Sequence, residues 1–249
     1  MPQFLRYVGI DYSGAETPTS SLKGLRVYLA DGIAVAEEVQ PPPSPRKYWT
    51  RRGIAEWLTA LLSEGIPTLV GIDHGFSFPI RYFEVHHLLP DWPTDQNIYV
   101  DFVRDGLCGN GEARMGNSRW RRLTEERCRA KSVFHFDVQG SVAKSTHAGI
   151  PWLRYLRQNG GDCIHFWPFD GWSIPEKHSA IAEIYPSLWK SLYPTEGRTA
   201  DQHDAYTVAT WLQAADQEHR LPMLLQPSPA LNFQQRSVAE VEGWILGVK

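Results

Sequence analysis

Residues 5–11 read Leu5-Arg6-Tyr7-Val8-Gly9-Ile10-Asp11, an apolar run that ends on an acidic residue. Residues 68–73 read Thr68-Leu69-Val70-Gly71-Ile72-Asp73 and repeat this pattern. Short apolar runs of this kind are typical of buried, parallel strands. In an open α/β sheet, ligands bind at the carboxyl ends of the strands. Two strands that each bring a carboxylate to that edge therefore indicate a metal site.

The segment between these two runs predicts a hairpin followed by a helix. Apolar residues 25–30 and 33–39 flank Asp31-Gly32, which is a strong signal for a two-residue hairpin. Apolar side chains then recur at helical spacing from 54 to 62, and Gly65 suits the end of that helix. Three strands, a helix and a strand in this order predict a mixed sheet in which the fourth strand lies beside the first.

Two later segments carry further acidic residues. Ile181-Ala182-Glu183-Ile184-Tyr185-Pro186 predicts another strand, and Asp201-Gln202-His203-Asp204-Ala205 opens a helix with one apolar face. We therefore predict an α/β fold with a mixed five-stranded sheet flanked by helices. Its core comprises residues 5–79 and 180–215.

We expect the whole chain, residues 1–249, to form one domain. Residues from about 80 to 175 lack a regular pattern, apart from a helix near 151–158, and predict a large, partly helical insertion over the sheet edge. Residues 220–249 form a C-terminal extension, with a final helix predicted over 237–246.

The acidic residues are of the type that binds hard divalent cations, which prefer carboxylate oxygens. Two such ions about 3.5–4 Å apart activate water and stabilise the leaving oxygen in phosphodiester cleavage. Asp201 lies one helical turn before Asp204 and shares a helix face with it. The predicted catalytic residues are Asp11, Asp73, Glu183 and Asp204. The predicted ligands of Mg²⁺ or Mn²⁺ are Asp11, Asp73, Asp201 and Asp204.

Each acid also has a structural interpretation. Asp201 suits the N-cap of its helix equally well, because the exposed N–H groups and the helix dipole favour an acid there. Asp11 and Asp73 each precede a turn and suit an Asx turn. Asp204, which lies past the cap, is the better candidate. Each acid alone is a weak indication, and the set in this order of elements is a stronger one.

Four motifs combine these acids with characteristic neighbours: Gly9-Ile10-Asp11-Tyr12-Ser13-Gly14, Gly71-Ile72-Asp73-His74-Gly75-Phe76-Ser77-Phe78-Pro79, Glu183-Ile184-Tyr185-Pro186 and Asp201-Gln202-His203-Asp204-Ala205. They resemble the signature segments of a family of predicted RNase H-like nucleases. The resemblance covers the core and implies a ribonuclease H-like fold, in which acids of the first strand, the fourth strand and the last helix bind metal. The Asp201-x-x-Asp204 spacing also resembles that of Holliday-junction resolvases. The resemblance leaves Glu183 either a fourth ligand or a structural hydrogen-bond acceptor, and we favour a role in the site.

Residues 119–131 form a basic run that also contains an aromatic residue. Runs of this kind often bind a phosphate backbone, so we predict that Arg119, Arg121 and Arg122 bind nucleic acid. Two acidic residues within the run offset its charge. A solvated, salt-bridged helix explains the run at least as well.

The remaining reactive side chains are less informative. Cys108, Cys128 and Cys163 are far apart and odd in number, so they support neither a disulfide framework nor a zinc site. His74 and His203 each neighbour a predicted metal ligand and suit proton transfer. A structural role is the more common one for such histidines.

The composition is that of an ordinary globular chain. Of its 249 residues, 42% are hydrophobic and 21% are charged, and the net charge is −3. A charge so near zero does not attract nucleic acid by itself, so binding would need a local basic patch. No run approaches the ~18 apolar residues of a membrane helix, and the N-terminus lacks a signal-peptide pattern. We expect a cytoplasmic protein with no membrane partner.

These observations predict a metal-dependent nuclease that uses Mg²⁺ or Mn²⁺ and has nucleic acid as its partner. A non-catalytic RNase H-like scaffold that binds nucleic acid or protein is an alternative, although buried acids are costly without a purpose. An actin-like phosphotransferase is a further alternative, because its phosphate loop also reads Gly-Ile-Asp-x-Gly. Such an enzyme needs a duplicated second half, for which the sequence shows no repeat.

Overall fold

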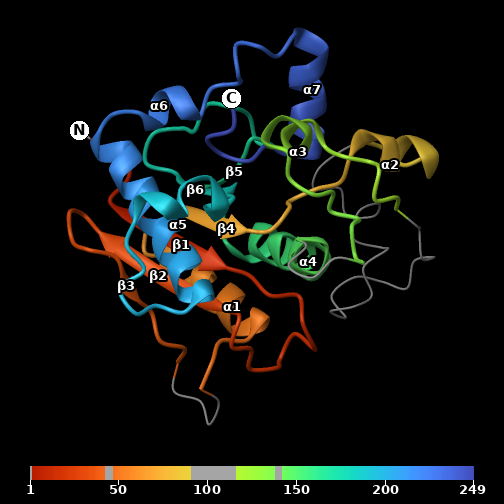
Figure 1. Cartoon of the computed structure of the whole chain (residues 1–249). Coiled ribbons are helices and arrows are strands. Elements are labelled where there is room, and N and C mark those ends of the chain that lie inside the picture. The colour runs from red at the N-terminus through yellow and green to blue at the C-terminus, as the bar shows by residue number, and fades with distance from the viewer. Residues whose placement is uncertain (1, 43–46, 91–115, 138–141) are drawn as a thin grey trace.

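The computed structural model shows an α/β fold in which helices cover both faces of one mixed sheet (Figure 1). It describes residues 2–42, 47–90, 116–137 and 142–249. The described strands have the order β3-β2-β1-β4-β6-β5. Their bounds are β1 (Arg6–Asp11), β2 (Arg26–Asp31), β3 (Glu37–Glu38), β4 (Thr68–Asp73), β5 (Ile164–Trp167) and β6 (Ser179–Glu183).

The pairing of the central strands brings the acidic strand ends together. β1 pairs antiparallel with β2 and parallel with β4, and Asp11 lies opposite Asp73. β6 pairs parallel with β4 on its other side and ends at Glu183. The predicted return of the fourth strand beside the first is confirmed. Three neighbouring parallel strands thus end on acids at one edge of the sheet.

The prediction of five strands is wrong, because β5 adds a sixth. β5 pairs parallel with β6 and lies within the segment that we predicted as an insertion. All of its side chains are buried, so it lacks the alternation that identifies a half-exposed strand. The predicted strand over 33–39 is also shorter than expected and pairs only at β3. Its first residues form the hairpin tip, where Ile33 and Val35 are exposed.

Two helices cover one face of the sheet. α1 (Arg51–Leu62) begins at Thr50, whose side chain accepts a hydrogen bond from the backbone N–H of Gly53. It packs against α4 (Ala143–Asn159), which contains the helix predicted near 151–158 and begins well before it. The apolar residues of α1 and α4 share one core with Val8 and Ile10 of β1.

α5 (Ala200–Gln217) covers the opposite face (Figure 1). Its first turn is fixed by a capping box, in which the Thr199 side chain accepts from the Gln202 N–H and the Gln202 side chain accepts from the Thr199 N–H. Thr199 is therefore the N-cap, and the capping interpretation of Asp201 is wrong. Asp201 lies within the first helical turn instead.

Two glycines allow α5 to approach the sheet closely. Gly9 of β1 and Gly71 of β4 are register partners. A Cβ atom on Gly9 would overlap the backbone oxygen of Ala205 and lie 2.5 Å from the backbone nitrogen of Ala209. A Cβ atom on Gly71 would lie 2.6 Å from Cγ1 of Val208. The missing side chains therefore set the distance between α5 and the two central strands.

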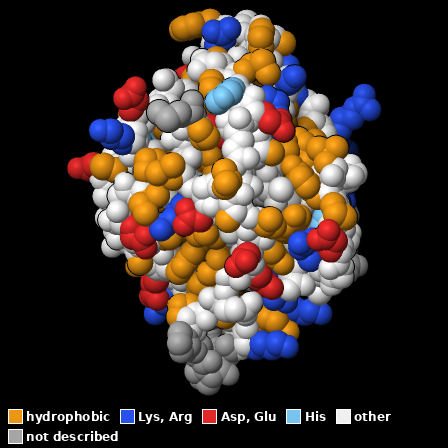
Figure 2. Space-filling view, turned by 90° about the vertical axis from the view of Figure 1, so that its left-hand side faces the viewer, with side chains coloured by type: hydrophobic (Ala, Val, Ile, Leu, Met, Phe, Trp, Pro, Cys, Tyr) orange, Lys and Arg blue, Asp and Glu red, His pale blue; other side chains and the backbone are white. Residues whose placement is uncertain are grey.

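The other described helices are short or lie near the C-terminus: α2 (Ile80–Val85), α3 (Leu123–Cys128), η2 (Pro186–Leu188), η3 (Lys190–Leu192), α6 (Leu221–Leu224) and α7 (Phe233–Glu242). α7 replaces the helix predicted over 237–246 and begins earlier. No helix in the described ranges is long and apolar enough to span a membrane. On the face seen in Figure 2, acidic and basic side chains are interspersed among apolar ones.

Replacing Gly9 with alanine is expected to destabilise the fold, because the added methyl group must push α5 away from β1. Overpacking of this kind costs about 1–3 kcal/mol, which lowers the melting temperature by roughly 2–4 °C per kcal/mol in a chain of this size. Gly24→Ala is the matched control, since its Cβ atom would meet Ser13 Cβ at an ordinary 3.4 Å. Thermal unfolding compares the two variants, and equal melting temperatures would contradict the close-approach argument.

Candidate functional site

A cleft of about 580 Å³ opens at the carboxyl ends of β1, β4 and β6. All five predicted acids line it: Asp11, Asp73, Glu183, Asp201 and Asp204. The first three are the last residues of their strands, and the other two come from the first turns of α5. The structure thus brings together side chains that are as much as 193 positions apart in the chain (204 − 11). Asp11, Asp73, Asp201 and Asp204 are half-buried.

Burial and mutual repulsion act on the carboxylates of the cleft. Burial raises the pKa of Asp11 well above its usual range, and the charges of Asp73, Asp201 and Asp204 raise it further. Burial raises the pKa of Asp73 to about 8, with additional contributions from Asp204 and Glu183. Burial also raises the pKa of Asp204. Near neutral pH the cluster therefore holds protons or needs cations.

The chemistry of these donors fits a hard divalent cation, since carboxylate oxygens are its preferred ligands. Among the residues that the structure describes, no three His, Cys, Asp or Glu side chains are grouped closely enough to hold a metal ion. The acids share the cleft without forming a finished coordination shell. Coordination by three of them would require their side chains to rotate toward one another.

Glu183 differs from the other acids because both of its oxygens are occupied. Arg122 donates to them from Nη1 and Nη2, at 2.6 Å each, and the backbone N–H of Phe76 donates to Oε2 at 3.1 Å. The Glu183 side chain is buried. A carboxylate held in this way favours the structural hydrogen-bond acceptor over the fourth metal ligand.

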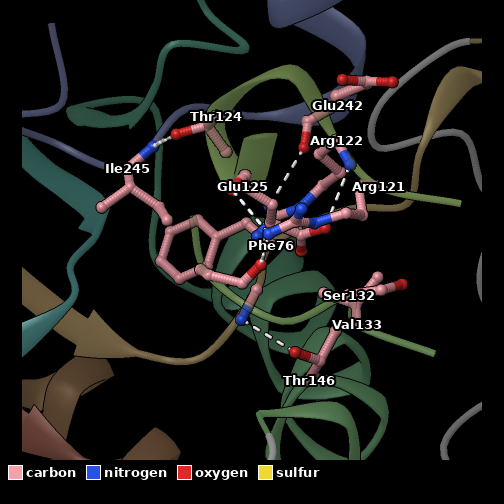
Figure 3. A network of polar contacts seen from close by, with 12 residues as sticks. Phe76, Arg121, Arg122, Thr124, Glu125, Ser132, Val133, Thr146, Glu242 and Ile245 are labelled. Carbon is pink, nitrogen blue, oxygen red and sulfur yellow. Dashed lines mark hydrogen bonds and ion pairs between the residues drawn. The ribbon is translucent and has the colours of Figure 1, made fainter. Parts of the chain in front are cut away.

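Arg122 lies at the centre of a buried polar network (Figure 3). In addition to Glu183, its Nε donates to Glu125 at 2.9 Å and its Nη1 donates to the backbone oxygen of Glu242 at 3.2 Å. A guanidinium with only 1% of its residue surface exposed cannot bind a phosphate backbone. The predicted nucleic-acid contact of Arg122 is therefore replaced by a structural one.

Arg122 is among the residues that line the cleft, whereas the two other predicted arginines lie outside the lining. Arg121 is half-buried and donates from Nη2 to the backbone oxygens of Glu125 and Ala130. Arg119 is exposed and belongs to the surface beside α3. Their role in nucleic-acid binding stays a prediction.

Four other cations line the cleft and were missed by the sequence reasoning: Arg129, Lys131, Lys144 and Lys190. All four are exposed. Only the first two lie in the basic run, and they are at its end. The other two are isolated in the sequence and come from the start of α4 and from η3. No local pattern identifies Lys144 and Lys190, because only the fold brings them to the acids.

The two histidines beside the acids have structural contacts. His74 is buried, and burial lowers its pKa to about 4, so the ring is neutral at pH 7. Its Nδ1–H donates to the Gly75 oxygen at 2.8 Å, and its ring packs on Tyr12. His203 donates from Nε2 to the Lys190 oxygen at 3.1 Å and so holds η3 against α5.

Asp73→Asn tests how much the charge of Asp73 destabilises the folded protein. A carboxyl whose pKa is raised on folding binds more protons in the native state than in the unfolded state. Its contribution to the free energy of unfolding is therefore fully present below the unfolded pKa of about 4 and is lost as pH rises toward 8. Without divalent ions, we expect Asp73→Asn to be about 1–3 kcal/mol more stable than the wild type at the upper end of this window. Urea unfolding across the pH range measures the difference, with the exposed Asp162→Asn as control. An unchanged pH slope in Asp73→Asn would contradict the argument.

Glu183→Gln separates the structural role of Glu183 from a role in metal binding. Loss of its charge leaves the buried Arg122 without its bidentate partner, and breaking a buried pair costs about 3–5 kcal/mol. We expect such a loss in urea unfolding with a chelator present. The exposed Glu126→Gln in α3 is the control. A loss below about 1 kcal/mol, typical of exposed pairs, would favour the metal-ligand interpretation.

The chain was compared with protein families, with curated proteins and with solved structures, and none of them matches it.

Proposed function

We propose that the cleft is the active site of a metal-dependent nuclease with a ribonuclease H-like fold. The observation that carries this proposal is the register of β1 and β4, which places Asp11 directly opposite Asp73 at the ends of two parallel strands. Asp204 of α5 lines the same cleft. These are the acids of the first strand, the fourth strand and the last core helix, the set that the resemblance to predicted RNase H-like nucleases implies.

Asp11, Asp73 and Asp204 would hold Mg²⁺ or Mn²⁺, with Asp201 as a further carboxylate. When bound, such ions supply an activated water and stabilise the leaving oxygen of a phosphodiester. The protein's own contribution is to hold these half-buried carboxylates together at one edge of the sheet. Glu183 fixes the start of the loop after β4 through the Phe76 N–H.

Nucleic acid is the proposed substrate because the acids are surrounded by exposed cations. Arg129, Lys131, Lys144 and Lys190 line the same cleft and would pair with phosphates. The net charge of −3 supplies no general attraction for a polyanion, so binding depends on this local group. Acids in the cleft and cations around them suit a phosphodiester substrate.

The two alternatives from the sequence receive less support. All described strands belong to a single sheet, so the described ranges contain no second half of the kind that an actin-like phosphotransferase needs. A non-catalytic scaffold would leave the half-buried acids without a purpose. The nuclease proposal accounts for both the acids and the cations.

The primary test is thermal unfolding with increasing Mn²⁺ or Mg²⁺. At a hundredfold excess over the dissociation constant, a ligand that binds only the native state adds about 2.7 kcal/mol, equivalent to roughly 5–10 °C here. We expect this shift in the wild type and in Asp162→Asn, and its loss in Asp11→Asn. The same proteins are then incubated with labelled single- and double-stranded oligonucleotides. Metal-dependent cleavage that survives the double change Asp11→Asn, Asp73→Asn would refute the proposal.

A further inference from the structure

Lys190 is the one described lysine or arginine for which the structure shows an ion pair with an acid of the cluster formed by Asp11, Asp73, Asp201 and Asp204. Its Nζ atom lies 3.6 Å from Oδ1 of Asp204. Its charge also reaches the neighbouring strand ends, where it lowers the raised pKa values of Asp11 and Asp73. The ammonium therefore acts on three of the four acids at once.

The backbone that carries Lys190 is anchored to α5, the helix that carries Asp204. His203 donates from Nε2 to the Lys190 backbone oxygen at 3.1 Å. Next to it, Trp189 stacks on Trp211 of α5 with ring centroids 3.8 Å apart. The side chain itself is 46% exposed and lines the cleft. These contacts hold the backbone of Lys190 beside the cleft, while its charged end remains exposed.

We propose that Lys190 is a tethered counter-ion of Asp204, which competes with a divalent cation for this carboxylate and so sets the metal affinity of the cleft. This inference rests on the proposed function, since it assumes that Asp204 is a metal ligand. The ion pair stabilises the acid cluster before metal binds. A divalent ion must displace the ammonium from Asp204 and then binds near a positive charge whose backbone is held beside the site.

The sign of the effect follows from Coulomb's law. A unit charge about 6 Å from a divalent ion in a largely aqueous surrounding raises its free energy by roughly 1.4 kcal/mol, which is a factor of about ten in affinity. Lys190 is thus a positioning residue that weakens metal binding, whereas a structural residue would strengthen it or leave it unchanged. Loss of the Lys190 charge should therefore raise the metal affinity if Lys190 competes with the metal, and should lower it or leave it unchanged if Lys190 is structural.

The experiment measures Mn²⁺ affinity by isothermal titration and by thermal unfolding, at one pH and one ionic strength. Lys190→Met replaces the apolar stem with one of similar length and removes the charged end, and we expect it to bind Mn²⁺ roughly tenfold more tightly than the wild type. Lys190→Arg restores the charge and should return the affinity to within about threefold of the wild type. Lys144→Met is the matched control, because Lys144 lines the same cleft and the structure shows no ion pair between it and these acids.

Three results would overturn the inference. Mn²⁺ affinity in Lys190→Met that equals or falls below that of the wild type would show a structural role. An equal gain in Mn²⁺ affinity in Lys144→Met would show that any positive charge in the cleft weakens metal binding, without a specific role for the ion pair between Lys190 and Asp204. In both cases a wild-type shift that is lost in Asp11→Asn leaves the proposed function intact. A wild type with no Mn²⁺ shift would overturn the proposed function and this inference together.

Discussion

The close approach of α5 to β1 and β4 is the constraint on which the rest of the structure depends. Gly9 and Gly71 lie side by side in the sheet, and α5 occupies the space that their side chains would need, with its backbone at Gly9 and with the Val208 side chain at Gly71. A larger residue at position 9 would press on the α5 backbone and carry Asp204 away from the strand ends. The same contact that closes the core therefore fixes the distance between the helix acid and the strand acids.

Once the acids are assembled, their charge must be balanced, and the molecule does this in three ways. Glu183 is neutralised by a buried guanidinium that takes both of its oxygens. Asp204 has an exposed ammonium, that of Lys190, as its partner. Burial and like charges raise the pKa of Asp11 and of Asp73, so these two favour the protonated form. The partner of Glu183 is buried, whereas Asp11, Asp73 and Asp204 are half-buried residues of the cleft lining.

The Arg122 network also ties distant parts of the chain to the edge of the sheet (Figure 3). Glu242, at the end of α7, accepts from the backbone N–H groups of Ile80 and Leu123 at 2.6 and 2.7 Å. Burial raises its pKa to about 7. The next residues continue to Ile245, which pairs with Glu183 in a parallel bridge. The segment around α3 and the C-terminal chain are thereby packed against the end of β6, and described residues of both the predicted insertion and the predicted extension line the cleft.

The sequence by itself determined the central strands, the helices α1 and α5, and the acids at the strand ends, because apolar runs and helical spacing are local patterns. It did not reveal β5, whose side chains are all buried and show no alternation. It also could not separate Glu183 from the other acids or assign Arg122 to the interior, since the two residues are 61 positions apart and their pairing exists only after folding. Lys190 is an isolated lysine in the sequence. Its position beside Asp204 was decided by the tertiary structure alone, because only the packing of η3 on α5 brings the two charges together.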